Sequence, residues 1–144
     1  MDNLSVFVET LQDLMITRNV KPSDIYKATK ISQNVIYAWL RKEAVPTVNT
    51  LVVLADYFGC SVDYLLGRTE HNTAKVTNPA TFPDRLRLLI DKNGTPRRKL
   101  SAETKISMCG IQRFLTGTGK PLLDNLIRLA VFFDCSVDYL LGRE

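Results

Sequence analysis

The sequence predicts an all-α protein in which one small helical unit occurs twice in tandem. Apolar residues recur at intervals of three and four positions, which is the spacing of amphipathic helices. No segment shows the alternation of apolar and polar residues that is typical of a half-buried strand. The nine-residue segment CSVDYLLGR stands at residues 60–68 and again, unchanged, at residues 135–143. Together these observations predict two copies of one helical domain.

The repeat extends well beyond this segment. An offset of 75 positions aligns residues 7–68 with residues 82–143 without a gap, and 23 of the 62 aligned positions are identical. So long a match indicates the duplication of a whole domain. Residues 69–81 are polar and rich in turn-forming residues, as expected of a linker. We therefore predict domains at residues 1–68 and 82–144, joined by a polar linker at residues 69–81.

The first helix of the first copy is predicted from six apolar residues that share one helical face: Leu4, Phe7, Val8, Leu11, Leu14 and Met15. A second, short helix is expected to begin at Pro22, because proline is tolerated in a first turn, and to bury Ile25. Ser32 is the expected N-cap of a third helix. That helix is expected to bury three side chains: Ile36, Trp39 and Leu40.

Pro46 interrupts the chain before a fourth helix, which has a broad apolar face between residues 48 and 58. Ser61 is expected to cap a short fifth helix, with Asp63 close to its positive end. Gly67 is expected to end that helix. The second copy repeats this scheme, with helices predicted at residues 82–92, 97–104, 108–116, 122–133 and 136–141.

Composition argues against several classes of protein. No apolar run reaches the roughly 18–20 residues of a membrane span, and the N-terminus lacks a secretory signal. We therefore expect a cytoplasmic protein that does not bind membranes. The three cysteines are expected to be reduced and mostly buried. The single histidine, His71, cannot build a conventional metal or catalytic site. Since no nucleophile–base pair, phosphate loop or metal-ligand cluster is found, we expect neither an enzyme nor a bound cofactor.

The net charge of +4 favours polyanionic partners, but only weakly. Residues 1–72 hold 7 Lys and Arg against 8 Asp and Glu, a net charge of −1, whereas residues 73–144 hold 12 against 7, a net charge of +5. The basic excess therefore lies in the second copy. A first copy that binds a polyanion must gather its cations on one face, from an available set of Arg18, Lys21, Lys27, Lys30, Arg41 and Lys42.

Residues 22–42, two short helices joined by a tight turn at Lys30-Ile31-Ser32, resemble a helix-turn-helix. Each unit of about 62 residues, with its leading helix and its ending (LADYFGCSVDYLLGR in the first copy), resembles the phage-repressor-like (Xre family) helix-turn-helix domain. The resemblance implies two tandem five-helix, lambda-repressor-like domains. It also implies sequence-specific binding of double-stranded DNA by a bacterial or phage transcription regulator, such as a repressor.

Such domains place the start of the third helix in the major groove. In the first copy this implies base-reading by Gln33, Asn34, Val35, Tyr37 and Ala38. Amide side chains pair with adenine, which contributes about 1–3 kcal/mol of discrimination. Phosphate contacts are expected from Lys21, Ser23, Arg41 and Lys42. The copy departs from the family at Pro22, usually Gln, and at Lys42, commonly Gly. The alternative is that Gln33 and Asn34 are merely polar surface.

The second copy opens its third helix with Met108-Cys109-Gly110, which carries no amide or charge. Its only obvious base readers are Gln112 and Arg113. Its cations suit a phosphate clamp with little sequence preference, formed by Arg97, Arg98, Lys99 and Lys120. The alternative is that this copy has lost DNA binding and serves in dimerisation. Cys109 is either a redox-sensitive thiol or, more simply, a small filler residue.

Two functions from different classes remain open. The leading one is a DNA-binding regulator whose two unlike copies read an asymmetric site. The other is a protein-interaction module, such as an antitoxin-like or dimerising helix-turn-helix protein. Salt dependence separates them, because DNA binding through several phosphates weakens steeply as salt rises.

Overall fold

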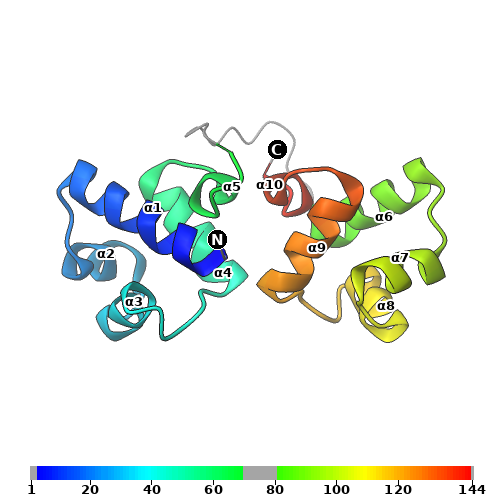
Figure 1. Cartoon of the computed structure of the whole chain (residues 1–144), viewed down its shortest axis with the longest axis horizontal. Coiled ribbons are helices and arrows are strands. Elements are labelled where there is room, and N and C mark those ends of the chain that lie inside the picture. Colours follow the sequence, from blue (N-terminus) through cyan, green and yellow to red (C-terminus); the bar gives the residue numbers. More distant parts are fainter. Residues whose placement is uncertain (1–2, 70–80, 144) are drawn as a thin grey trace. The chain divides into compact units, whose positions relative to one another are not determined.

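The computed structural model describes residues 3–69 and 81–143, and every regular element within these ranges is a helix (Figure 1). The predicted all-α fold class is confirmed. The chain divides into two compact units, Met1–Ala74 and Lys75–Glu144. The predicted linker at residues 69–81 lies outside the described residues except for Thr69 and Thr81. The two units are described separately below.

The first unit contains α1 (Asn3–Arg18), α2 (Pro22–Thr29), α3 (Gln33–Leu40), α4 (Val48–Phe58) and α5 (Val62–Leu65). Helix α1 packs against α3 and α5, and α2 packs against α3 and α4. The core is apolar and closely packed, and the rings of Phe7 and Trp39 meet edge to face with centroids 5.7 Å apart. Leu40, expected in the core, is only half-buried. The other apolar residues of the predicted faces are buried, except for four that are half-buried: Leu4, Met15, Val48 and Val52.

The turn between α2 and α3 is closed by one hydroxyl group. Thr29 Oγ1 donates to the carbonyl oxygen of Ile25 at 2.7 Å and accepts from the backbone N–H of Ile31 at 3.2 Å. Lys30 between them adopts a left-handed conformation with φ of 66°. Because these bonds satisfy backbone groups at the end of α2, they set the direction in which α3 begins.

The second unit contains α6 (Phe82–Asn93), α7 (Arg97–Thr104), α8 (Met108–Thr116), α9 (Leu123–Phe133) and α10 (Val137–Leu140). Helix α6 packs against α8 and α10, and α7 packs against α8 and α9. The predicted helix ranges agree with these bounds to within one residue at each end. Leu122 is the N-cap of α9 and so stands just outside it.

The serine caps differ between α3 and α8. Ser61 and Ser136 cap α5 and α10 as expected, accepting from backbone N–H groups three residues on at 3.0 and 2.9 Å. Ser107 likewise accepts from the backbone N–H of Gly110 at 3.0 Å. Ser32 occupies the N-cap position of α3, but its side chain makes no capping hydrogen bond. The prediction that Ser32 caps α3 is therefore right in position and wrong in the bond it makes.

This difference predicts unequal effects of two matched substitutions. Ser107→Ala removes a capping bond and is expected to lower the free energy of unfolding of the second unit by about 1 kcal/mol. Ser32→Ala removes no such bond and is expected to change stability by less than about 0.5 kcal/mol. Urea unfolding followed by circular dichroism measures both. Equal losses in the two variants would contradict the assignment.

The repeated ending of each unit contains a charged pair. Asp63 is buried and lies 3.4 Å from Nε of Arg68, while Asp138 is buried and lies 3.0 Å from Nε of Arg143. Asp63 was expected only to interact with the helix dipole, and the arginine five residues on adds a paired cation. Since a buried carboxylate needs a partner, the pair ties the end of each unit to its last short helix.

Candidate nucleic-acid interface

Helix α3 has one buried and one exposed side. Ile36 and Trp39 are 0% and 1% exposed and anchor the helix in the core. On the other side Gln33 and Asn34 are exposed in the first turn, together with Val35 and Tyr37. Ala38, the fifth predicted base-reading residue, is half-buried. The exposed side thus combines two amides, a phenol and aliphatic carbon, which can meet polar and methyl groups on a partner.

The predicted phosphate contacts of the first unit are only partly available. Lys21, Arg41 and Lys42 are exposed, whereas Ser23 is half-buried. Arg41 already pairs through Nε with the acidic side chain of Glu43 at 3.1 Å. Lys42, where the family commonly has glycine, adopts φ of 61° two residues after the end of α3. The carboxylate of Glu43 therefore competes with a phosphate for the guanidinium group of Arg41.

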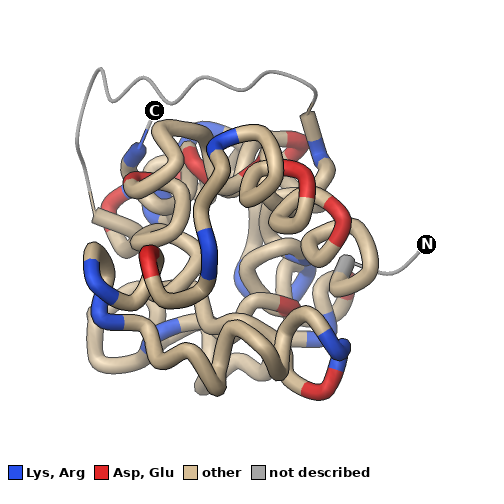
Figure 2. Tube along the Cα trace, turned by 90° about the vertical axis from the view of Figure 1, so that its left-hand side faces the viewer, with Lys and Arg blue, Asp and Glu red and all other residues tan. Residues whose placement is uncertain are grey.

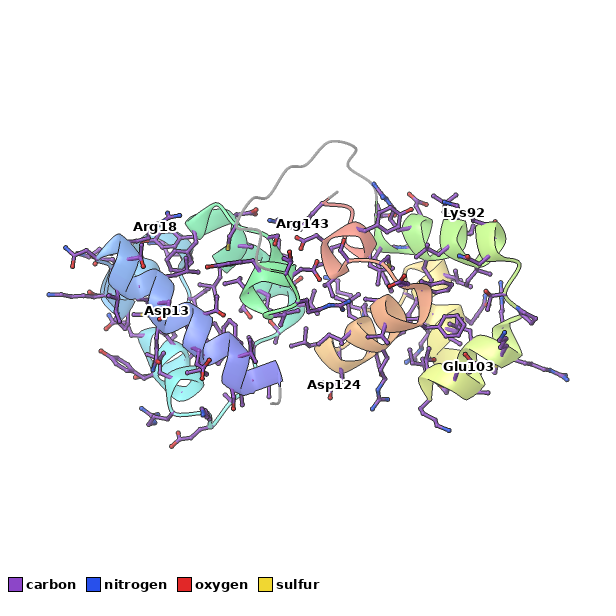
Figure 3. The ribbon with its side chains drawn as sticks, turned by 45° about the horizontal axis from the view of Figure 1, so that its top comes forward. Asp13, Arg18, Lys92, Glu103, Asp124 and Arg143 are labelled. Atoms are coloured by element: carbon purple, nitrogen blue, oxygen red, sulfur yellow. The ribbon has the colours of Figure 1, made fainter. Side chains whose placement is uncertain are left out.

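One cation of the available set is committed elsewhere. Arg18 lies at the end of α1 (Figure 3). Its Nη2 donates to the carbonyl oxygen of Phe58 at 2.9 Å. It thereby satisfies a carbonyl at the C-terminus of α4, where a cation also interacts favourably with the helix dipole. Because of this bond, Arg18 is better described as a structural residue than as part of a cationic face. Elsewhere along the trace, Lys and Arg positions are interspersed with Asp and Glu positions (Figure 2).

Helix α8 of the second unit shows the same division into two sides. Ile111, Phe114 and Leu115 are buried, while Met108, Cys109, Gln112 and Arg113 are exposed. Cys109 is exposed on the outward side of α8, while Cys60 is buried and Cys135 is half-buried. Cys109 therefore does not fill space in the core.

Helix α7 brings its cations to the same region. The side chains of Arg97, Arg98 and Lys99 are exposed, as is Lys120 in the loop after α8. Arg97 donates from Nη1 to Oε1 of Gln112 at 2.5 Å, which joins a predicted phosphate residue to a predicted base reader. No sequence signal pointed to this bond, because the two residues lie on different helices.

The loop after α8 supports the other predicted reader. A Cβ atom at Gly119 would lie only 3.0 Å from Cβ of Arg113, so the Arg113 side chain rests against this glycine. The backbone N–H groups of Thr118 and Gly119 both donate to the carbonyl oxygen of Arg113. Gly119 therefore leaves room for Arg113 at the end of the exposed side of α8.

Within residues 3–69 and 81–143, no group of His, Cys, Asp and Glu side chains is arranged to hold a metal ion. In the same ranges none of the helices has both the length and the apolar character that crossing a membrane requires.

Residues 10–70 match the model of the Cro/C1-type HTH DNA-binding domain family. No curated protein and no solved structure matches the chain. The matched range runs from within α1 past α5 and includes the whole of α2 and α3. It supports the resemblance of the first unit to an Xre-like helix-turn-helix domain and indicates sequence-specific DNA binding by a regulator.

Proposed function

We propose that the protein is a bacterial or phage transcription regulator whose first unit reads bases in the major groove of duplex DNA through Gln33, Asn34, Val35, Tyr37 and Ala38. One observation carries this proposal. The two amides are exposed in the first turn of α3, while Ile36 and Trp39 on the opposite side hold the helix against the core. The first turn of the third helix is the part that such domains insert into the groove.

The second unit is, on this proposal, a second copy of the same domain, with the domains at residues 1–68 and 82–144. The positions of its helices support this. Helices α7, α9 and α10 begin and end 75 residues after α2, α4 and α5, which is also the offset of the sequence repeat.

The second unit's proposed role is to hold phosphates through Arg97, Arg98, Lys99 and Lys120, which are all exposed. Its net charge of +5 over residues 73–144 favours this role. Because α3 and α8 carry different side chains, the bound site is expected to be asymmetric. A regulator of this kind binds double-stranded DNA without a cofactor and catalyses no reaction.

A salt titration tests the proposal. The seven cations assigned to phosphates predict that log K falls with log salt concentration with a slope of about −6, since each contact contributes roughly −0.9. The duplex is first selected from a random library by the full-length protein, and binding is then followed by fluorescence anisotropy. Failure to enrich any duplex, or a slope near zero, would contradict the proposal.

A protein-interaction module, antitoxin-like or dimerising, is the second candidate, and exposed apolar side chains in the second unit favour it. Leu122 and Val131 are 76% and 67% exposed, and Met108 is 45% exposed. Under this alternative the second unit serves as a homodimer contact or binds a protein partner. Sedimentation of the full chain in the presence and absence of duplex distinguishes the two: dimerisation that persists without DNA and needs these side chains would support the module.

A further inference from the structure

The bond between Arg97 and Gln112 determines which way the Gln112 amide is turned. Nη1 of Arg97 lies 2.5 Å from the amide oxygen Oε1. Arginine carries only donors, so the amide atom that faces it must be the oxygen and cannot be the nitrogen. The side chain of Gln112 makes no other hydrogen bond within the part of the chain that the structure describes. The two N–H donors of Nε2 are therefore available for a ligand.

This orientation works against the usual partner of glutamine in DNA. Glutamine recognises adenine with both ends of its amide, since Nε2 donates to N7 and Oε1 accepts from the N6 amino group. At Gln112 the oxygen already accepts from a guanidinium group. To pair here, the N6 amino group of adenine would have to approach the same oxygen beside the positive charge of Arg97. The hydrogens of that amino group carry partial positive charge, so the guanidinium group repels them. Pairing with adenine is thus disfavoured by crowding and by electrostatics.

Guanine suits the same arrangement. It presents two acceptors, N7 and O6, in the major groove, and arginine is its commonest partner. We infer that Arg97, by holding Oε1 of Gln112, makes α8 a donor-only surface that prefers guanine to adenine, with Arg113 as the neighbouring donor. Arg97 acts here as a positioning residue. The inference rests on the proposed DNA binding of the second unit, and it adds that α8 of this unit contacts bases in the major groove.

The first unit has no hydrogen bond equivalent to the one between Arg97 and Gln112. An offset of 75 places Pro22 at the position of Arg97 and Tyr37 at the position of Gln112. The bond cannot form between Pro22 and Tyr37, because the proline side chain offers no donor. The exposed amides Gln33 and Asn34 of α3 keep both their donors and their acceptors. The two units are accordingly expected to prefer different bases, adenine in the first and guanine in the second.

The test compares two variants that each remove one exposed cation from α7. Arg97→Met frees the amide of Gln112, whereas Arg98→Met removes the neighbouring arginine, which makes no bond to Gln112. Binding of the full-length variants is measured on a set of duplexes that differ at single base pairs. These base pairs lie in the part of the site that the second unit contacts, which is called the second half-site. The wild-type protein is expected to prefer guanine to adenine by about tenfold at one of these positions.

Arg97→Met is expected to abolish or reverse that preference, and Arg98→Met is expected to keep it. Both variants are expected to bind every duplex more weakly and to lose about one unit of salt slope, since each removes one phosphate contact. The inference is overturned if Arg97→Met retains the guanine preference, or if the wild type shows no guanine preference anywhere in that half-site while still binding DNA. A wild-type protein that binds no duplex at all overturns the proposed function itself, and with it this inference.

Discussion

Replacing Gln33 and Asn34 together by alanine is expected to weaken binding to the preferred duplex by about a hundredfold, because each amide pair with adenine contributes about 1.4 kcal/mol, near the lower end of the usual range. Affinity for an unrelated duplex is expected to change little, since both side chains contact bases and neither contacts phosphates. Both are exposed in the first turn of α3, so their removal leaves the core intact. Anisotropy titrations with the two duplexes measure the ratio.

Arg41→Ala is the matched control for this double variant. Arg41 stands at the end of the same helix and is exposed, but it is assigned to a phosphate. Its removal is expected to weaken binding to both duplexes alike and to lower the salt slope by about one unit. If the double variant also lost affinity equally for both duplexes, Gln33 and Asn34 would be phosphate contacts or structural residues and not base readers.

Gly67→Ala is expected to lower the free energy of unfolding of the first unit by about 2–4 kcal/mol, through two causes that add. Gly67 adopts φ of 72°, a left-handed conformation that costs an alanine energy. A Cβ atom at this position would also lie 2.0 Å from Cγ1 of Val6. Since α1 and α5 pack against each other, relieving this clash requires a shift of Val6 at their contact. Unfolding is measured by fluorescence of Trp39, which is the only tryptophan and is buried in the first unit.

Gly59→Ala separates the two causes. Gly59 has φ of 67° but no atom within 4 Å of the position of an added Cβ. Its substitution is therefore expected to cost only the backbone term, about 1–2 kcal/mol. Equal losses at the two glycines would show that the close approach of Val6 relaxes without cost.

The positions of the helices could be predicted from the sequence because the signals that place them are local. The spacing of apolar residues, the helix-starting Pro22 and the caps Ser61 and Ser136 act within a few residues of the element that they define. The offset of 75 then predicted where the helices of the second unit begin and end. The exposure of Gln33 and Asn34 followed from the same reasoning, since the opposite face of a short helix had to carry Ile36 and Trp39 inward.

The partners of Arg18 and Arg97 were decided by tertiary structure alone. Arg18 binds a carbonyl group 40 residues away, and Arg97 binds an amide 15 residues away on another helix. Sequence spacing does not predict such contacts, because they depend on how helices pack against one another. The physical reason is a difference in range: hydrophobic periodicity and capping are properties of one segment, whereas the orientation of the Gln112 amide is set by a neighbouring helix that packing brings beside it.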